Sequence, residues 1–500
     1  MAYQETTKRS YGQQLSGSFK GIISGFLMPI LGTTLLMISI TSVAQENVSD
    51  AKTITIMAVN DMHAAVDMFP KFAGIVDSVR AIHPNMLLFS AGDNRTGNPV
   101  NDRHKMPGYP MTELMNRVGF NASAVGNHEF DSNISGFRNL IEVSNFCFLC
   151  ANIEAHDSLR LHTLPFRFFE RNGIRIGVLG LIQTGPNGLP DTHPNNVKGI
   201  SFPSAIEVAK DYMWMRKQCD VLILLTHLGF EDDLLLADAC PEADIIIGGH
   251  SHTTVPNRIL RNGVIVTQAG RVLRYVTELQ IEVSGGKVTG KNYNLINVSA
   301  TKQLNKDIQN VVNRFNDNEM LKEVLTTVTT PFENAEELGS LMADAQCFGT
   351  DSEIALVNRG GVRYSKHATG DFTMKDAFML DPFDNSLVTF EMTGQEVEDA
   401  IISTFKIEED PYVSGITYSI SLNADKSVKK LSVYLSNGKA INKNKTYRVA
   451  TNSYLASVCP LLQSKTGTDT FTGATDALIN FLKKQPSVSY QGVKRVTIEK

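Results

Sequence analysis

Short apolar runs rich in β-branched residues alternate with amphipathic stretches between residues 52 and 268. Stretches with helical spacing, such as 110–118 and 204–218, separate these runs. Continuous apolar strands separated by helices are typical of a sheet that is buried on both faces. The pattern therefore predicts an α/β fold, with strands over 53–59, 85–91, 122–125, 175–181, 220–225, 243–247 and 264–268.

Polar residues with metal-binding or acid–base chemistry follow the last apolar residue of successive runs. In α/β sheets, ligand sites form beyond the carboxyl ends of the strands, so residues far apart in sequence meet at one edge. One such residue is commonly structural, but the repetition at strand after strand predicts a shared site. Its candidate members are Asp61, His63, Asp93, Asn127, His128, His227, His250 and His252.

The stretch Gly126-Asn127-His128-Glu129-Phe130-Asp131 places an amide, an imidazole and a carboxylate at one strand end. Asn127 and His128 are neighbours, so one turn does not direct both at the same ion. His128 is therefore left as a hydrogen-bond donor, and Asp131 is placed to orient its ring and keep it charged. We expect Glu129 to be a supporting residue.

The donor set mixes oxygen and nitrogen, which suits Zn, Mn, Fe(II) or Co better than Ca or Mg. One tetrahedral ion needs fewer ligands than this. Two divalent transition-metal ions about 3.5–4 Å apart would use them all, with Asp93 as the bridging carboxylate. Such a pair lowers the pKa of a bound water and clamps the attacking and leaving oxygens, which is what phosphoester hydrolysis requires.

The second half of the chain lacks the strand-end pattern. Apolar residues at helical spacing over 301–328 predict a helix, either joining two domains or ending the first. Arg363, beside the pair Gly360-Gly361, offers a guanidinium and backbone N–H groups to an anion; a glycine turn with a surface arginine is the alternative.

At 500 residues the chain is too long for one ordinary core, and the net charge of −5 argues against nucleic acid as a partner. Residues 1–44 are basic and then apolar, ending Ser42-Val43-Ala44, which predicts a signal peptide. An uncleaved anchor is the alternative, since the uncharged stretch is long enough to span a bilayer. With cleavage, we expect an exported protein, periplasmic or extracellular, with no stable membrane span.

Six cysteines follow this segment, an even number that permits disulfides in an oxidising compartment. We expect buried thiols with one or two bridges. Cys147 and Cys150 are close enough in sequence to form a tight one.

In order, the motifs D-x-H, GD, GNHEFD, THLG and GGHSH resemble those of the calcineurin-like metallophosphatases. The second half resembles the carboxy-terminal domain of secreted 5′-nucleotidases and UDP-sugar hydrolases. The resemblance implies a four-layer αββα sandwich over 52–300, a linking helix over 301–328, and a separate α/β (α+β) substrate-binding domain over 329–500.

The resemblance also implies two ligand sets that share Asp93, with His128 and Asp131 as the catalytic pair. The first ion would be held by Asp61, His63, Asp93 and His252, and the second by Asp93, Asn127, His227 and His250.

In the carboxy-terminal half, the family binds phosphate with an arginine matching Arg363 and the base between aromatics matching Phe383 and Tyr454. Asn358 and Gly361 would lie near the substrate. The family usually continues after the second aromatic with Gly-Gly-Asp, whose acid contacts ribose. Here the chain reads Leu455-Ala456-Ser457-Val458, without that acid.

The favoured function is hydrolysis of nucleoside 5′-monophosphates or related small phosphoesters. A UDP-sugar or dinucleotide pyrophosphatase and a cyclic-nucleotide phosphodiesterase are alternatives within the enzyme class. A catalytically silent phosphate-binding surface protein is the alternative outside it.

Overall fold

The computed structural model describes residues 51–407, 410–423 and 427–499. The predicted signal peptide, residues 1–44, lies outside these ranges. Among the described residues, no helix combines the length and apolarity needed to cross a membrane.

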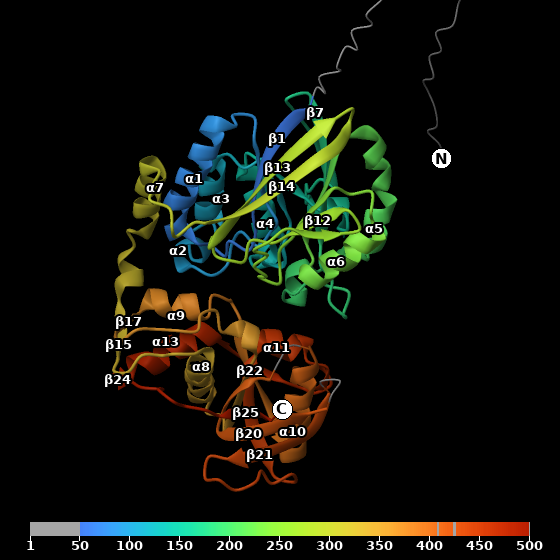
Figure 1. Ribbon diagram of the computed structural model, residues 1–500. Coiled ribbons are helices and arrows are strands. Elements are labelled where there is room, and N and C mark those ends of the chain that lie inside the picture. Colours follow the sequence, from blue (N-terminus) through green and yellow to red (C-terminus); the bar gives the residue numbers. More distant parts are fainter. Residues whose placement is uncertain (1–50, 408–409, 424–426, 500) are drawn as a thin grey trace, which may run out of the picture. The chain divides into compact units, whose positions relative to one another are not determined.

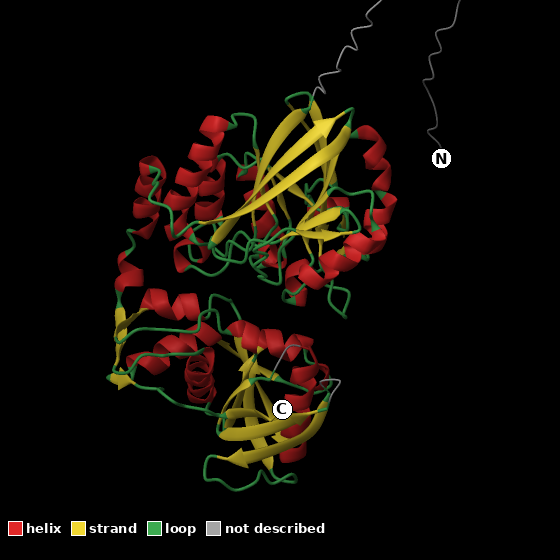
Figure 2. Ribbon diagram, viewed as in Figure 1, coloured by secondary structure: helices red, strands yellow, loops and turns green. Residues whose placement is uncertain are grey.

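Two six-stranded sheets form the centre of the amino-terminal half (Figures 1 and 2). The first contains β1 (Lys52–Val59), β2 (Leu87–Ser90), β3 (Ala122–Ala124), β4 (Cys147–Leu149), β13 (Tyr275–Ser284) and β14 (Lys287–Asn297). The second contains β6 (Phe166–Arg171), β7 (Ile174–Ile182), β9 (Val221–His227), β10 (Ile245–Ile247), β11 (Ile259–Arg261) and β12 (Val264–Thr267).

The strand orders are β14-β13-β1-β2-β3-β4 and β11-β12-β10-β9-β7-β6. Strands β1 to β4 pair in parallel, and so do β7, β9, β10 and β12. Parallel neighbours bring their carboxyl ends to the same edge. All the predicted strands are present, with ends shifted by at most two residues.

Alternating side chains of each strand enter different cores, as the period of a β-strand requires. In β1, Ile54 and Ile56 join a cluster shared by the two sheets, whereas Met57 and Val59 face the opposite side. That side packs against α1 (Phe69–Ile82), α3 (Tyr109–Val118) and α4 (Asn133–Val143).

The outer face of the second sheet packs against α5 (Ala205–Asp211) and α6 (Phe230–Ala239). The layers are therefore helix, sheet, sheet, helix, and the predicted αββα sandwich is confirmed. Short elements complete this half: α2 (Pro99–Asp102), β5 (Glu154–Ala155) and β8 (Ile200–Ser201).

The carboxy-terminal half has its own mixed sheet, in the order β19-β16-β22-β18-β23. Its strands are β16 (Ile354–Val357), β18 (Ser386–Thr393), β19 (Tyr412–Ser414), β22 (Thr446–Asn452) and β23 (Thr468–Gly473). Two three-stranded sheets accompany it: β15 (Val324–Val328), β17 (Gly370–Thr373) and β24 (Ser487–Val488), and β20 (Ile416–Leu422), β21 (Val428–Leu435) and β25 (Val496–Glu499).

Helices cover these sheets (Figure 2). They are α8 (Ala335–Thr350), α9 (Met374–Leu380), α10 (Gly394–Ile407), α11 (Ser453–Val458), α12 (Pro460–Gln463) and α13 (Ala474–Lys483).

The helix predicted over 301–328 is only partly correct. Helix α7 (Lys306–Asn316) occupies its first part, a 3-10 turn covers Glu319–Lys322, and Val324–Val328 is strand β15. Four of the five residues of β15 are β-branched, a composition that favours an extended chain. Pairing of β15 with β17 and β24 then overrides the helical spacing.

The prediction of disulfide bridges is wrong, since all six cysteines, each within the described residues, are free thiols. Cys147 and Cys150 lie three positions apart along β4 and its end. Such positions point to opposite faces of a strand, and the two side chains indeed join different core clusters.

Candidate metal centre and adjoining cavity

The predicted ligands lie where parallel strands end. Asp61 and His63 follow β1, Asp93 follows β2, and His250 and His252 follow β10, all with left-handed φ angles between 44° and 77°. Such backbone costs about 1–3 kcal/mol per residue and persists only where the surroundings hold it. The sharp turns direct these side chains to one place.

The structure brings all seven predicted ligands together. Ligand atoms of Asp61, His63 and His252 form one group, and those of Asp93, His227 and His250 form another, each within 4.8 Å. A third group joins His63 and Asp93 to His128. Asn127 reaches the second group, with its Oδ1 3.2 Å from His227 Nε2 and 3.1 Å from His250 Nδ1.

The orientation of the donors fits a divalent cation. Nδ1 of His63 lies 3.0 Å from the Thr96 carbonyl and Nδ1 of His227 lies 2.7 Å from the Ala91 carbonyl, so in both rings Nε2 faces the centre. Metal-binding histidines are characteristically oriented in this way. Asn127 donates its amide N–H to the Asp191 carbonyl, which turns its oxygen inward.

The pKa values of buried groups in the cluster differ strongly from their ordinary values. Burial raises the pKa of Asp61 to about 6, against the attraction of His227. Burial would lower the pKa of His227, but the carboxylates of Asp93 and Asp61 outweigh it and raise the value to about 10. The same carboxylates that retain a proton on His227 would attract a metal cation.

In contrast to His227, the histidines His63 and His252 are held neutral. Nε2 of His63 lies 2.9 Å from Nε2 of His252. Burial, together with Arg363, lowers the pKa of both, to about 3 for His252. Neutral imidazole is the form that ligates a metal.

His128 is linked both to a carboxylate and to the metal group. Its Nδ1 lies 2.8 Å from Asp131 Oδ2, and its backbone N–H donates to Asp93 Oδ1 at 2.9 Å. Burial would lower the pKa of His128, but Asp131 and Asp93 outweigh it and raise the pKa above the usual value. The contact expected between His128 and Asp131 is present, and Thr96 Oγ1 also donates to Asp131.

Glu129 supports the turn, as expected from the sequence. Its buried carboxylate accepts the backbone N–H groups of Asp93, Asn94 and Gly126, at 3.0, 2.9 and 2.6 Å. Position 126 requires glycine because the backbone there lies against Asp93. A Cβ atom would be only 2.2 Å from Asp93 Oδ1. A side chain at this position would displace the carboxylate.

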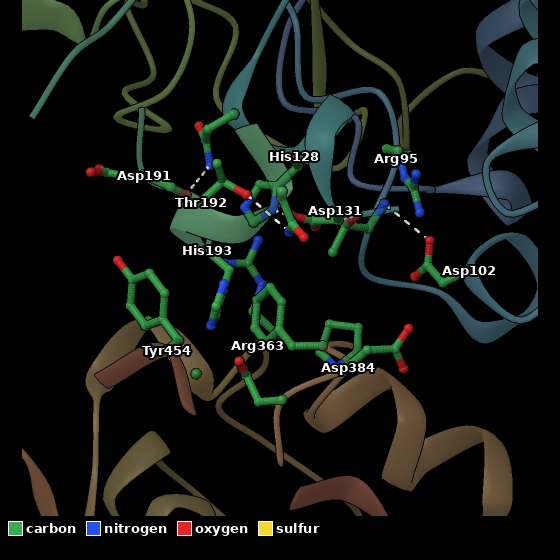
Figure 3. Close-up of a pocket in the computed structure, with 18 of the residues that line it drawn as sticks. Arg95, Asp102, His128, Asp131, Asp191, Thr192, His193, Arg363, Asp384 and Tyr454 are labelled. Atoms are coloured by element: carbon green, nitrogen blue, oxygen red, sulfur yellow. Dashed lines mark hydrogen bonds and ion pairs between the residues drawn. The ribbon is translucent and has the colours of Figure 1, made fainter. Parts of the chain in front are cut away.

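A cavity of about 970 Å³ adjoins the cluster, and the five residues predicted to bind substrate line it. Figure 3 shows His128 and Asp131 facing Arg363 and Tyr454 across this space. Phe383 stacks on His128, with ring centres 5.8 Å apart. Nη2 of Arg363 lies 3.2 and 3.3 Å from the two ring nitrogens of His63. The predicted substrate residues are Asn358, Gly361, Arg363, Phe383 and Tyr454.

Several residues of the site were not predicted. Asn60 donates to Asp61 Oδ2 at 2.6 Å, and Asp191 Oδ2 lies 3.3 Å from His250 Nε2. Arg271 and Asp469 line the cavity. Asn60 could have been suspected, because it directly precedes the D-x-H motif. The others lie in loops or a strand without a motif, so the sequence carries no comparable signal for them.

Two family models match the chain. The one described as calcineurin-like phosphoesterase matches residues 54–254, and the one described as 5′-nucleotidase, C-terminal domain matches residues 319–460. The first range contains every predicted metal ligand. The second contains all the predicted substrate residues.

Curated relatives match along most of their length. Protein UshA from Yersinia enterocolitica is 28% identical over 450 residues, covering 76% of this chain and 80% of that protein. A 5′-nucleotidase from Vibrio cholerae is 28% identical over 436 residues, covering 74% and 77%.

Solved structures share the fold. A 5′-nucleotidase precursor from Thermus thermophilus superposes with a TM-score of 0.80 at 22% identity, covering 89% of this chain and 99% of that one. The sulfate thiohydrolase SoxB from the same organism gives 0.74 at 14% identity, covering 89% and 96%. Given the two matched domains and the strand-end motifs, the chain belongs to the family that joins a calcineurin-like metallophosphatase domain to a 5′-nucleotidase carboxy-terminal domain.

Proposed function

We propose that this protein is a phosphomonoesterase of the 5′-nucleotidase type, which uses two divalent transition-metal ions to release phosphate from nucleoside 5′-monophosphates. The observation that carries the proposal is the convergence of buried carboxylate, amide and imidazole donors at the mouth of a cavity that also holds an arginine and two aromatic rings.

In this proposal one ion is Zn, Mn, Fe or Co, held by Asp61, His63, Asp93 and His252. The second is held by Asp93, Asn127, His227 and His250. Ions held there would supply the positive charge that activates a water and neutralises the phosphoryl oxygens. Their identity is left to measurement.

His128 acts as the proton donor to the leaving oxygen. Asp131, 2.8 Å from its Nδ1, fixes the ring and stabilises its charged form. Nε2 of His128 lies on the side of Asp93, 3.9 Å from its Oδ2, and is the atom from which the proton moves.

Substrate is held from the carboxy-terminal half. Arg363 binds the phosphate, Asn358 and Gly361 lie beside it, and Phe383 and Tyr454 contact the base. The acid missing after Tyr454 has a substitute in Asp469, whose carboxylate accepts from Ser386 Oγ at 2.8 Å and from the backbone N–H of Phe471 at 2.7 Å. A carboxylate fixed in this way accepts hydrogen bonds from the hydroxyl groups of a ribose.

The cavity volume favours one second candidate, a UDP-sugar or dinucleotide pyrophosphatase. About 970 Å³ lies near the upper end of the usual range for ligand sites and leaves room beyond a nucleoside monophosphate.

The test is a substrate panel with purified protein, containing AMP, UMP, UDP-glucose, a cyclic nucleotide and a sugar phosphate. We expect phosphate release from the monophosphates, its loss after chelation, and its recovery with Mn or Zn. Metal analysis should find about two ions per chain. A protein that holds both ions but hydrolyses no phosphoester contradicts the proposal and favours a binding role.

We also propose that the protein is exported, on the pattern of residues 1–44. Fractionation of the native host, with amino-terminal sequencing of the mature chain, tests this. A mature chain beginning near Gln45 supports cleavage, whereas an intact amino terminus in the membrane fraction supports the anchor.

A further inference from the structure

Five arginines line the cavity, and their partners divide them into two classes. Arg103 pairs with Asp384 at 2.7 Å, Arg359 pairs with Asp410, and Arg95 donates to Ser132 Oγ. Among the described residues, no carboxylate forms an ion pair with the remaining two, Arg271 and Arg363. Arg95 forms no ion pair with a described residue either, but it is held by the Ser132 hydroxyl. Arg271 and Arg363 are thus the cavity arginines bound to neither a carboxylate nor a hydroxyl group in the described part of the chain.

These two arginines lie beside the same part of the metal centre. Arg363 contacts His63, and Arg271 is close enough to exert an electrostatic effect on both His252 and Arg363. Arg363 is partly buried and Arg271 is exposed. Two like charges near each other repel, and the repulsion is reduced when an anion binds between them. The arrangement therefore favours an anionic ligand at this point.

The backbone on both sides of Arg271 is tied to the end of β1, on one side to the predicted metal ligand Asp61 and on the other to its neighbour Asn60. Asn60 Nδ2 donates to the Gly270 carbonyl at 2.6 Å, and the Val272 N–H donates to the Asp61 carbonyl at 2.8 Å. Val272 and Leu273 both have left-handed φ angles, 49° and 53°. That conformation is a rare one for a β-branched residue such as Val272. The loop is thus held at a cost in a shape that places the backbone of Arg271 beside Asp61.

We propose that Arg271 is a substrate-binding residue that, together with Arg363, selects a terminal dianionic phosphoryl group over a monoanionic phosphodiester. A phosphomonoester carries close to two negative charges at neutral pH, with a second pKa of about 6, whereas a diester carries one. A monoester also has three unesterified oxygens to share between two guanidinium groups, whereas a diester has only two. The inference rests on the proposed function and assigns its selectivity for monoesters to these two arginines.

The test compares Arg271→Met and Arg271→Lys with a matched control, Arg274→Met. Arg274 is exposed on the same loop and does not line the cavity. Substrates are 4-nitrophenyl phosphate and bis(4-nitrophenyl) phosphate. We expect Arg271→Met to lower kcat/KM for the monoester by about 10- to 100-fold and for the diester by less than about threefold. Arg271→Lys should be intermediate, and Arg274→Met should match the native protein on both.

Calorimetric titration with inorganic phosphate gives a readout that does not need turnover. Arg271→Met should bind phosphate at least about tenfold more weakly than native protein of equal metal content. Equal phosphate binding, or equal loss of monoester and diester hydrolysis, overturns the inference and leaves the proposed function standing. Native protein that hydrolyses neither ester contradicts the proposed function, and phosphate binding then decides the role of Arg271 alone.

Discussion

His128 is the residue on which the proposed chemistry and the metal centre can be separated experimentally. Its side chain contacts Asp131 and its backbone N–H contacts Asp93, but its ring is not needed for either predicted ligand set. We expect His128→Ala to lower kcat by about 10²- to 10⁴-fold, the range of general acid catalysis, with metal content unchanged. His156→Ala, an exposed histidine on a surface turn, is the control. Loss of metal from His128→Ala would show that the ring is a ligand.

Residue by residue, the strand-end motifs were informative because each ligand follows an apolar run directly. Seven ligand candidates and the pair His128 and Asp131 could be gathered from the sequence in this way, and the structure brings them together. Asp191 and Arg271 could not, because they reach the site from loops whose paths depend on tertiary contacts such as those of Asn60.

Among the elements, α6 carries a buried acid that makes stability depend on pH. Asp233, in its first turns, accepts from Thr226 Oγ1 at 2.6 Å, while its Oδ2 has no hydrogen-bond partner among the described residues. Burial raises the pKa of Asp233 to about 8. The folded protein therefore retains a proton that the unfolded chain, with a pKa near 3.8, releases. This contribution to stability is complete below about pH 4 and is lost as pH rises towards 8.

Asp233→Asn removes this dependence, since the amide needs no proton to remain neutral. Each pH unit in that window changes the free energy of unfolding by up to about 1.4 kcal/mol. The stability of the variant relative to native protein should thus increase by about 2–3 kcal/mol between pH 6 and pH 8. Urea unfolding at both values measures it, with the exposed neighbour Asp232→Asn as control. A difference that is the same at both pH values would rule out titration of Asp233.

In the proposed function, strand β23 provides the acid that the segment after Tyr454 lacks. Asp469 lines the cavity from this strand, fixed by Ser386 and by the backbone of Phe471. We expect Asp469→Asn to raise KM for AMP by about tenfold, the effect of losing a charge-assisted hydrogen bond, and to leave 4-nitrophenyl phosphate unaffected. The second substrate has no ribose and so serves as an internal control. Equal effects on both would place Asp469 at the phosphate instead.

Element types were predictable where one signal dominated. The parallel strands of the first half are mostly apolar and several end at motifs, so both their positions and their shared edge followed from the sequence. The type of the segment 324–328 was not predictable. Its apolar residues have helical spacing, but four of its five residues are β-branched, and only pairing with β17 and β24 decides between a helix and a strand.

At the scale of the whole molecule, the even number of cysteines was misleading. A bridge requires two side chains that meet in space, and sequence spacing does not provide that information. The division into two halves was clearer, because the composition and the motifs change beyond residue 300. In the proposed function, substrate specificity depends on both halves, because each contributes residues to the lining of the cavity.

The stability of the whole chain should depend on divalent metal. Asp61, Asp93 and His227 are almost completely buried, and buried charges destabilise a fold unless they are paired. An ion that binds only the folded protein stabilises it, by about 2.7 kcal/mol per site at a hundredfold excess over Kd. We therefore expect chelation to lower the Tm by several degrees and Mn or Zn to restore it.

Asp93→Ala should abolish this metal-dependent shift in Tm, because Asp93 contributes to two of the three ligand groups. Asp384→Ala, on the cavity wall outside those groups, should keep it. Retention of the full metal-dependent shift in Asp93→Ala would remove Asp93 from the centre.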